Sequence, residues 1–150
     1  MAHDGLQFPN GLRFSADETL LMVADSASRW IWSYQVQPNG DLANGEPFYR
    51  LELPLANDGK LVNAWADGIA FDASGDLYAA TKSGIQICDQ VGRVFGILRK
   101  PSAADPSNLV FGGSDFQTLY VTAKDKVFRR RLQQKGYLPW APAKWPPAHM

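Results

Sequence analysis

The chain has 150 residues, 45% of them hydrophobic, and its 15 basic and 15 acidic residues cancel to a formal net charge of zero. This length can bury a core of single-domain size, and the balanced charge argues against nucleic acid and anionic membrane surfaces as partners. No stretch approaches the ~20 apolar residues of a membrane span and the N-terminus lacks an apolar signal segment, so a cytoplasmic location is expected.

The first predicted unit begins near residue 9. Its segments alternate in polarity or are rich in β-forming residues, which is typical of strands rather than helices. Residues 15–18 join the first two segments as a tight turn, and Asn39-Gly40 is a strong hairpin signal before the last one. The expected strands are residues 9–15, 20–25, 30–37 and 48–53.

The second and third units repeat this pattern and begin near residues 66 and 106. Residues 56–64 separate the first two units and predict a connecting loop, because Asn57-Asp58-Gly59 breaks any periodicity. The expected strands are residues 66–71, 77–81, 84–89 and 93–98 in the second unit, and 106–111, 119–123 and 127–132 in the third.

The spacing of the three units predicts an all-β fold of the β-propeller type, with about three blades at residues 1–138. Repeats of roughly 40 to 50 residues, each with several strands, are in the range of propeller blades. Each unit has a small polar residue four positions before a phenylalanine, and the three polar residues are Asn10, Asp67 and Ser107. We expect these residues at one end of the innermost strands, pointing toward the central channel.

Residues 139–150 differ in composition, with four prolines and two tryptophans. This segment cannot form a central strand or the interior of a helix. It predicts an extended strap whose Trp140 and Trp145 pack on the propeller surface, or alternatively a tail that a proline-binding partner recognises.

Several kinds of chemistry lack the residues they require. Cys88 is the only cysteine, so the sequence offers neither an intrachain disulfide nor a cysteine-based zinc site, and a small packed side chain is expected there. The two histidines, His3 and His149, stand at the chain ends, and no Gly-x-Ser-x-Gly motif is present. A serine-histidine-aspartate hydrolase is therefore disfavoured.

Short motifs in this order resemble the family of senescence marker protein (regucalcin), gluconolactonase and luciferin-regenerating enzyme. The resemblance covers about residues 5 to 135 and looks like the C-terminal half of a family member. The matching pieces are Pro9-Asn10-Gly11-Leu12, Leu21-Met22-Val23-Ala24-Asp25, Asp67-Gly68-Ile69, Gly75-Asp76-Leu77-Tyr78, Asn108-Leu109-Val110-Phe111 and Thr118-Leu119-Tyr120-Val121-Thr122. The family usually has glycine where Glu18 stands in this chain.

The resemblance implies a six-bladed propeller of roughly twice this length that hydrolyses sugar lactones with a divalent cation, usually calcium. It assigns Asn10 as a metal ligand, and Asp67 as both a metal ligand and the catalytic residue. A further glutamate ligand lies in a part of the family sequence that has no counterpart here. Asn-Gly and Asp-Gly pairs are also common hairpin turns, so a purely structural reading of both motifs stays open.

The residue types at these positions favour calcium or magnesium over zinc, because they offer hard oxygen ligands without sulfur or imidazole. Ser107 and Asn108 are candidates for contacts with substrate hydroxyl groups, or alternatively turn residues that satisfy the backbone. Taken with the resemblance, the sequence predicts a calcium-dependent sugar lactonase. The alternatives are a non-catalytic half-propeller that binds metal or a partner, and a piece of a longer lactonase.

An arc of three blades leaves sheet faces exposed at both of its ends, which natural β-proteins avoid. Two copies related by a two-fold axis would supply six blades and bring two Asp67 and two Asn10 side chains toward the axis. We therefore expect a homodimer that rebuilds a six-bladed ring.

Overall fold

A computed structural model describes residues 5–138, which form three antiparallel sheets and contain no helix. Each sheet is one blade, and its strands follow one another in chain order. Blade 1 consists of β1 (Pro9–Phe14), β2 (Leu20–Asp25), β3 (Trp30–Val36) and β4 (Leu42–Arg50). Blade 2 consists of β5 (Ile69–Phe71), β6 (Leu77–Thr81), β7 (Gly84–Cys88) and β8 (Val94–Leu98). Blade 3 consists of β9 (Asn108–Gly112), β10 (Thr118–Ala123) and β11 (Lys126–Arg131).

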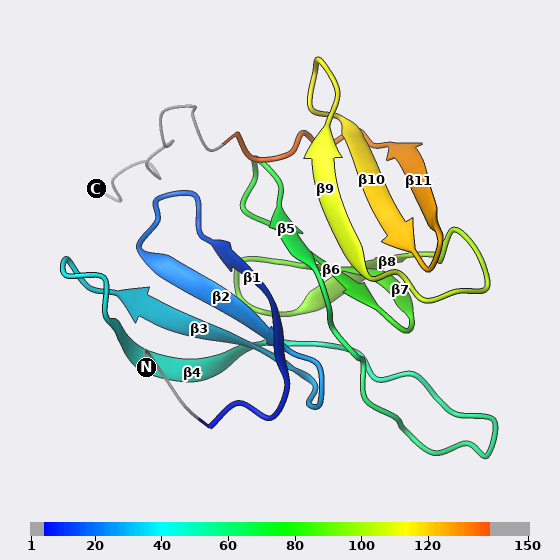
Figure 1. The fold of residues 1–150 in the computed structure, drawn as a ribbon, viewed down its shortest axis with the longest axis horizontal. Helices are drawn as coiled ribbons and strands as arrows, with labels where there is room; N and C mark the ends of the chain where they lie inside the picture. The colour runs from blue at the N-terminus through cyan, green and yellow to red at the C-terminus, as the bar shows by residue number, and fades with distance from the viewer. Residues whose placement is uncertain (1–4, 139–150) are drawn as a thin grey trace.

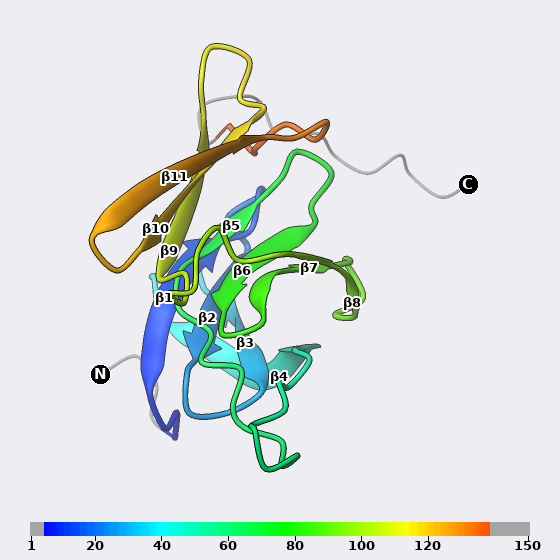
Figure 2. The ribbon, with the colours of Figure 1, turned by 90° about the vertical axis from the view of Figure 1, so that its right-hand side faces the viewer.

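The three blades fan out from a shared inner edge formed by β1, β5 and β9 (Figure 1). Strand β5 contacts β1 on one side and β9 on the other, so the first strand of every blade lies beside its counterpart. Viewed from the side, blade 2 lies between blade 3 and blade 1 (Figure 2). This arrangement confirms the expected all-β propeller architecture.

The outer strand of blade 1 is longer and begins earlier than the sequence predicts. It spans Leu42–Arg50 rather than residues 48–53, because pairing with β3 resumes directly after the turn at Asn39-Gly40. The ladder tolerates Gly45 and Pro47 through two shifts of register, and Asn44 has a left-handed backbone with φ of 51°. Such bulges leave no clear periodic signal in the sequence. The predicted strap at residues 139–150 lies outside the described residues.

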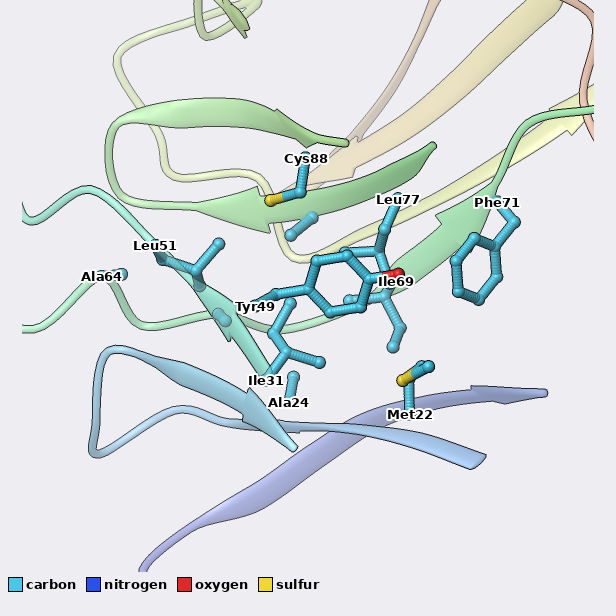
Figure 3. Close-up of a cluster of buried hydrophobic side chains, with 12 residues drawn as sticks. Met22, Ala24, Ile31, Tyr49, Leu51, Ala64, Ile69, Phe71, Leu77 and Cys88 are labelled. Atoms are coloured by element: carbon cyan, nitrogen blue, oxygen red, sulfur yellow. The ribbon is translucent and has the colours of Figure 1, made fainter. Parts of the chain in front are cut away.

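One hydrophobic cluster joins blade 1 to blade 2 (Figure 3). Tyr49 extends from β4 across the gap toward Ile31 of blade 1 and toward Ile69 and Leu77 of blade 2. Cys88 is fully buried in the same cluster, where burial raises the pKa of its thiol to about 12. The expected packing role of this cysteine is confirmed.

A second cluster joins blade 2 to blade 3. It includes Tyr78 and Phe111, whose rings meet edge to face with centroids 5.0 Å apart. Strands β5 and β6 of the middle blade contribute alternate residues to the two clusters. Both strands are therefore buried on both faces, which explains their nearly uninterrupted apolar sequence.

A buried glutamine connects blade 2 to the chain that leaves blade 1. The Gln86 amide donates to the carbonyl of Glu52 at 2.8 Å and accepts from the N–H of Glu52 at 2.8 Å. It also donates to the Thr81 hydroxyl at 3.2 Å. Because all of these hydrogen bonds are formed, the buried amide fixes the path of the connection between the two blades.

Residues 133–138, which we call the crossing segment, pass over one end of all three blades. The Tyr137 hydroxyl donates to the carbonyl of Ala16 in blade 1 at 2.7 Å. In blade 2 the N–H of Ala73 donates to the carbonyl of Lys135 at 2.7 Å, and in blade 3 the N–H of Gly136 donates to the carbonyl of Phe116 at 2.8 Å. The segment thus holds the turn after each innermost strand in place.

Among the described residues, no helix has the length and hydrophobicity needed to cross a membrane.

Candidate functional site

The opposite end of the innermost strands brings the three predicted polar positions together. The N–H of Gly68 donates to the carbonyl of Ser107 at 2.9 Å, which joins blades 2 and 3 at this end. Gly11 lies against the backbone of Asp67, since a Cβ atom on Gly11 would be 2.1 Å from the Asp67 carbonyl oxygen. Gly11 and Gly68, which follow Asn10 and Asp67, therefore allow the chains to approach closely. Asn10 lies in β1, while Asp67 and Ser107 lie just before β5 and β9, so the three residues share one end of the innermost strands.

The orientation of Asn10 is set by a chain of hydrogen bonds. Its Nδ2 donates to Oγ of Ser26 at 3.3 Å, and the Ser26 hydroxyl in turn donates to the carbonyl of Ala66. Within residues 5–138, Oδ1 of Asn10 has no hydrogen bond. Because the amide nitrogen is engaged with Ser26, the free oxygen is available as a neutral ligand.

Asp67 stands at the start of blade 2 with its backbone fixed and its carboxylate free. Its N–H donates to the carbonyl of Ala80 at 2.9 Å. Within the described part of the chain, no hydrogen bond or ion pair involves the carboxylate, and partial burial raises its pKa above the ordinary value of 3.8. A carboxylate that is partly desolvated and lacks a counter-ion is stabilised by a bound cation, and it can accept a proton from an attacking water molecule.

Ser107 and Asn108 lie beside these residues but make local contacts. The Ser107 hydroxyl is 2.9 Å from the hydroxyl of Thr122 in its own blade. Asn108 accepts the N–H of Leu109 through Oδ1 at 2.8 Å and packs against Gly68. Asn108 is exposed, and its amide nitrogen remains as a hydrogen-bond donor for a ligand.

Asp25 serves the site indirectly. It is buried and accepts the N–H of Phe8 at 2.7 Å, so it fixes the chain that enters β1. The next residue, Ser26, is the hydrogen-bond partner of Asn10. Asp25 is the last residue of β2. The role of Ser26 depends on tertiary contacts that no local sequence pattern reveals.

Three further side chains near this end were missed by sequence reasoning. Phe8 precedes Asn10 by two residues and Trp65 precedes Asp67 by two, and their rings meet with centroids 6.3 Å apart. The ammonium group of Lys82 lies 5.0 Å from the centre of the Trp65 ring. The tryptophan two residues before Asp67-Gly68 is the one sequence signal near this cluster, and by itself it does not indicate the contacts with Phe8 and Lys82.

The donor set fits part of a site for a hard cation. Asn10 supplies a neutral oxygen and Asp67 a charged one, both suited to calcium or magnesium. Within residues 5–138, no three histidine, cysteine, aspartate or glutamate side chains cluster to hold a metal. Calcium takes about six to eight oxygen ligands, so two side chains of one chain leave most positions to water, substrate or other protein groups.

The other end of the same strands has different chemistry. A pocket of about 260 Å³ lies there beneath the crossing segment, and Arg13, Phe71, Phe111 and Tyr137 are among its lining residues. The lining contains no carboxylate. Among the described residues, this pocket therefore offers a cation no charged oxygen ligand, unlike the end that carries Asn10 and Asp67.

Comparison with known proteins gives a consistent picture. The family model described as SMP-30/Gluconolactonase/LRE-like region matches residues 1–125. A gluconolactonase of Zymomonas mobilis is 33% identical over 134 residues, which are 88% of this chain and 37% of the relative.

Solved structures share the fold. The gluconolactonase XC5397 of Xanthomonas campestris superposes with a TM-score of 0.68 at 25% identity, over 89% of this chain and 39% of its own. The calcium-binding protein regucalcin of Agrobacterium tumefaciens superposes with a TM-score of 0.62 at 22% identity, over 77% of this chain and 37% of its own. The chain thus spans well under half the length of these relatives.

Proposed function

This chain belongs to the SMP-30/gluconolactonase/LRE-like family, and we propose that it forms part of a divalent-cation-dependent hydrolase of sugar lactones. The observation that carries the proposal is the placement of Asn10 on β1 and of Asp67 just before the adjacent strand β5, with Oδ1 of Asn10 and the Asp67 carboxylate both unpaired within residues 5–138. Relatives named gluconolactonase and 6-deoxy-6-sulfogluconolactonase support the substrate class.

Asn10 and Asp67 hold the cation, and calcium or magnesium is the proposed ion. When bound, the cation supplies polarisation of the lactone carbonyl and stabilises negative charge on its oxygen. Ser26 keeps the Asn10 amide turned so that its oxygen points away from the Ser26 hydroxyl. Asn10→Ala should therefore weaken cation binding without disturbing β1.

Asp67 is the proposed general base. As the attacking water forms a bond to the lactone carbonyl carbon, Asp67 accepts its proton and then returns a proton to the ring oxygen as the ring C–O bond breaks. The product is an aldonic acid. Ser107 and Asn108 are proposed to contact substrate hydroxyl groups, with the amide nitrogen of Asn108 as the donor.

The raised pKa of Asp67 makes this function sensitive to acid. A base must be ionised, so hydrolysis should fall at acid pH as protons compete with the cation for the Asp67 carboxylate. Asp67→Asn keeps the shape of the side chain but removes both charge and basicity.

The test is the rate of acid release from glucono-δ-lactone, measured in a pH-stat with calcium and with a chelator. We expect calcium-dependent hydrolysis by the native chain and a loss of about 10²-fold or more in Asp67→Asn, as is usual for a general base. Calcium binding without hydrolysis of any aldonolactone would favour the second candidate, a non-catalytic propeller that binds metal.

For the 150-residue chain we further propose a homodimer, supported by the outward faces of the two end blades. On blade 1, Leu12 is 62% exposed, and it points away from the cluster that blade 2 covers. On blade 3, Val127 is 71% exposed and lies on the face opposite Leu119 and Val121. Pairing blade 1 of one copy with blade 3 of the other would cover both faces and join six blades around one channel. The cytoplasmic location stays an expectation from the sequence.

A further inference from the structure

Trp65 combines two features that are unusual for a bulky aromatic residue. Its backbone lies in the left-handed region, with φ of 51°, and its side chain is 45% exposed. Bulky residues avoid positive φ because Cβ crowds the backbone, and such conformations concentrate at functional sites. Neither folding propensity nor core packing accounts for a tryptophan here, since the cluster of blades 1 and 2 does not include it.

The Trp65 ring is held by side chains from two other segments. Phe8, which is 54% exposed, meets it edge to face at an interplanar angle of 66°. The Lys82 ammonium group lies 5.0 Å from the ring centre, and the N–H of Lys82 donates to the carbonyl of Ala64 at 2.8 Å. Phe8 directly precedes β1, Trp65 lies in the segment that leads into β5, and Lys82 directly follows β6, so the fold assembles an aromatic surface from three separate segments.

This surface is attached directly to the residues of the proposed site. The N–H of Ser26 donates to the carbonyl of Phe8 at 2.9 Å, and the Ser26 hydroxyl joins Asn10 to the carbonyl of Ala66. Ala66 is fully buried and stands between Trp65 and Asp67. The backbone segments that carry Phe8 and Trp65 are therefore joined directly to those that carry Asn10 and Asp67.

We propose that Trp65 is a substrate-positioning residue on which the sugar ring of the lactone and of its aldonate product stacks. The C–H groups on one face of a sugar carry partial positive charge and match the electron-rich face of an indole. The Lys82 ammonium group lies over the ring, 5.0 Å from its centre, so the sugar stacks on the opposite face. The positive charge of Lys82 favours an anionic ligand such as an aldonate. The inference rests on the proposed function for its substrate class, while Trp65 itself takes no part in the chemical step.

The test uses sodium gluconate as a probe that cannot be hydrolysed, together with glucono-δ-lactone. For Trp65→Gly, we expect gluconate binding measured by calorimetry and the KM for the lactone to weaken by about 3- to 10-fold, with kcat within about twofold of the native value. Trp65→Phe should restore most of the affinity, because it keeps an aromatic face. Glycine suits the positive φ, and a thermal melt of each variant verifies that the fold is retained.

Phe95→Ala is the matched control, since Phe95 is an exposed aromatic residue on β8 of the middle blade. It should change neither gluconate affinity nor KM. Unchanged gluconate affinity and KM in Trp65→Gly would overturn the inference and leave the lactonase proposal intact. Gluconate binding that depends on Trp65 in a chain without lactonase activity would instead retain the inference and reject the proposed function.

Discussion

Asp72 is almost completely buried and shows how one residue can both build a turn and limit stability. Its Oδ1 accepts the N–H groups of Ser74 and Asp76 at 2.8 and 3.0 Å, which shapes the turn between β5 and β6. Its Oδ2 lies near the phenol of Tyr78 without a hydrogen bond of good geometry. Burial raises the pKa of Asp72 despite the hydrogen bonds that lower it.

This raised pKa gives a defined dependence of stability on pH. The folded chain binds the Asp72 proton more tightly than the unfolded chain does. The protonated Asp72 side chain therefore stabilises the fold at low pH, and this stabilisation is lost as the pH rises above 3.8 and through the raised pKa. Asp72→Asn keeps an acceptor at Oδ1 and removes the buried charge. At pH 7 the variant should be more stable by about 1 kcal/mol, the lower end of the cost of an unsatisfied buried group.

Urea unfolding at pH 4 and pH 7 measures this effect. The advantage of Asp72→Asn should grow between the two values, while Asp125→Asn, at an exposed carboxylate in the last hairpin, should show no such trend. An equal gain in stability at both pH values would mean that ionisation of Asp72 does not destabilise the folded chain.

At the scale of elements, the three turns after the innermost strands are equivalent but differ in one residue. The fourth position of each turn is left-handed, and it is Glu18 in blade 1, Gly75 in blade 2 and Phe116 in blade 3, with φ of 58°, 89° and 55°. Glu18 and Phe116 both stand in a left-handed position that blade 2 fills with glycine. A non-glycine residue in this conformation is strained.

Glu18→Gly should therefore stabilise the chain. We expect an increase of about 0.5–1 kcal/mol in the free energy of unfolding. The backbone strain relieved in the folded chain outweighs the greater conformational entropy of glycine in the unfolded chain. Thermal unfolding measures it. Ser74→Gly in the equivalent turn of blade 2 is the control, and it should destabilise because Ser74 does not have positive φ. Equal effects of the two changes would contradict this account.

The elements also show how far sequence reasoning reaches. The alternation of β1, β5 and β9 is strong enough to place Asn10, Asp67 and Ser107 at corresponding strand ends, because each strand keeps the same spacing to its phenylalanine. The start of β4 could not be predicted, since bulges hide its periodicity. The cluster around Trp65 could not be predicted either, because it is built from contacts between distant segments and from a backbone conformation unfavourable to tryptophan.

At the scale of the whole molecule, the uncovered faces of blades 1 and 3 lead to a prediction about assembly. The native 150-residue chain should sediment as a dimer at micromolar concentration. Leu12→Asp places a charge on the open face of blade 1 and should shift the population to monomer. Phe95→Asp, on the middle blade, should leave the dimer intact. A native chain that sediments as a monomer would rule out the closed six-bladed pair.

Calcium titration by calorimetry tests most directly whether the ends of the innermost strands form one cation site. We predict saturable calcium binding by the native chain, with affinity reduced by about tenfold or more in Asp67→Ala, which removes the charged ligand, and by less in Asn10→Ala. Asp125→Ala, which removes an exposed carboxylate elsewhere, should bind calcium like the native chain. Native affinity in Asp67→Ala, or no calcium binding by the native chain, would contradict the account.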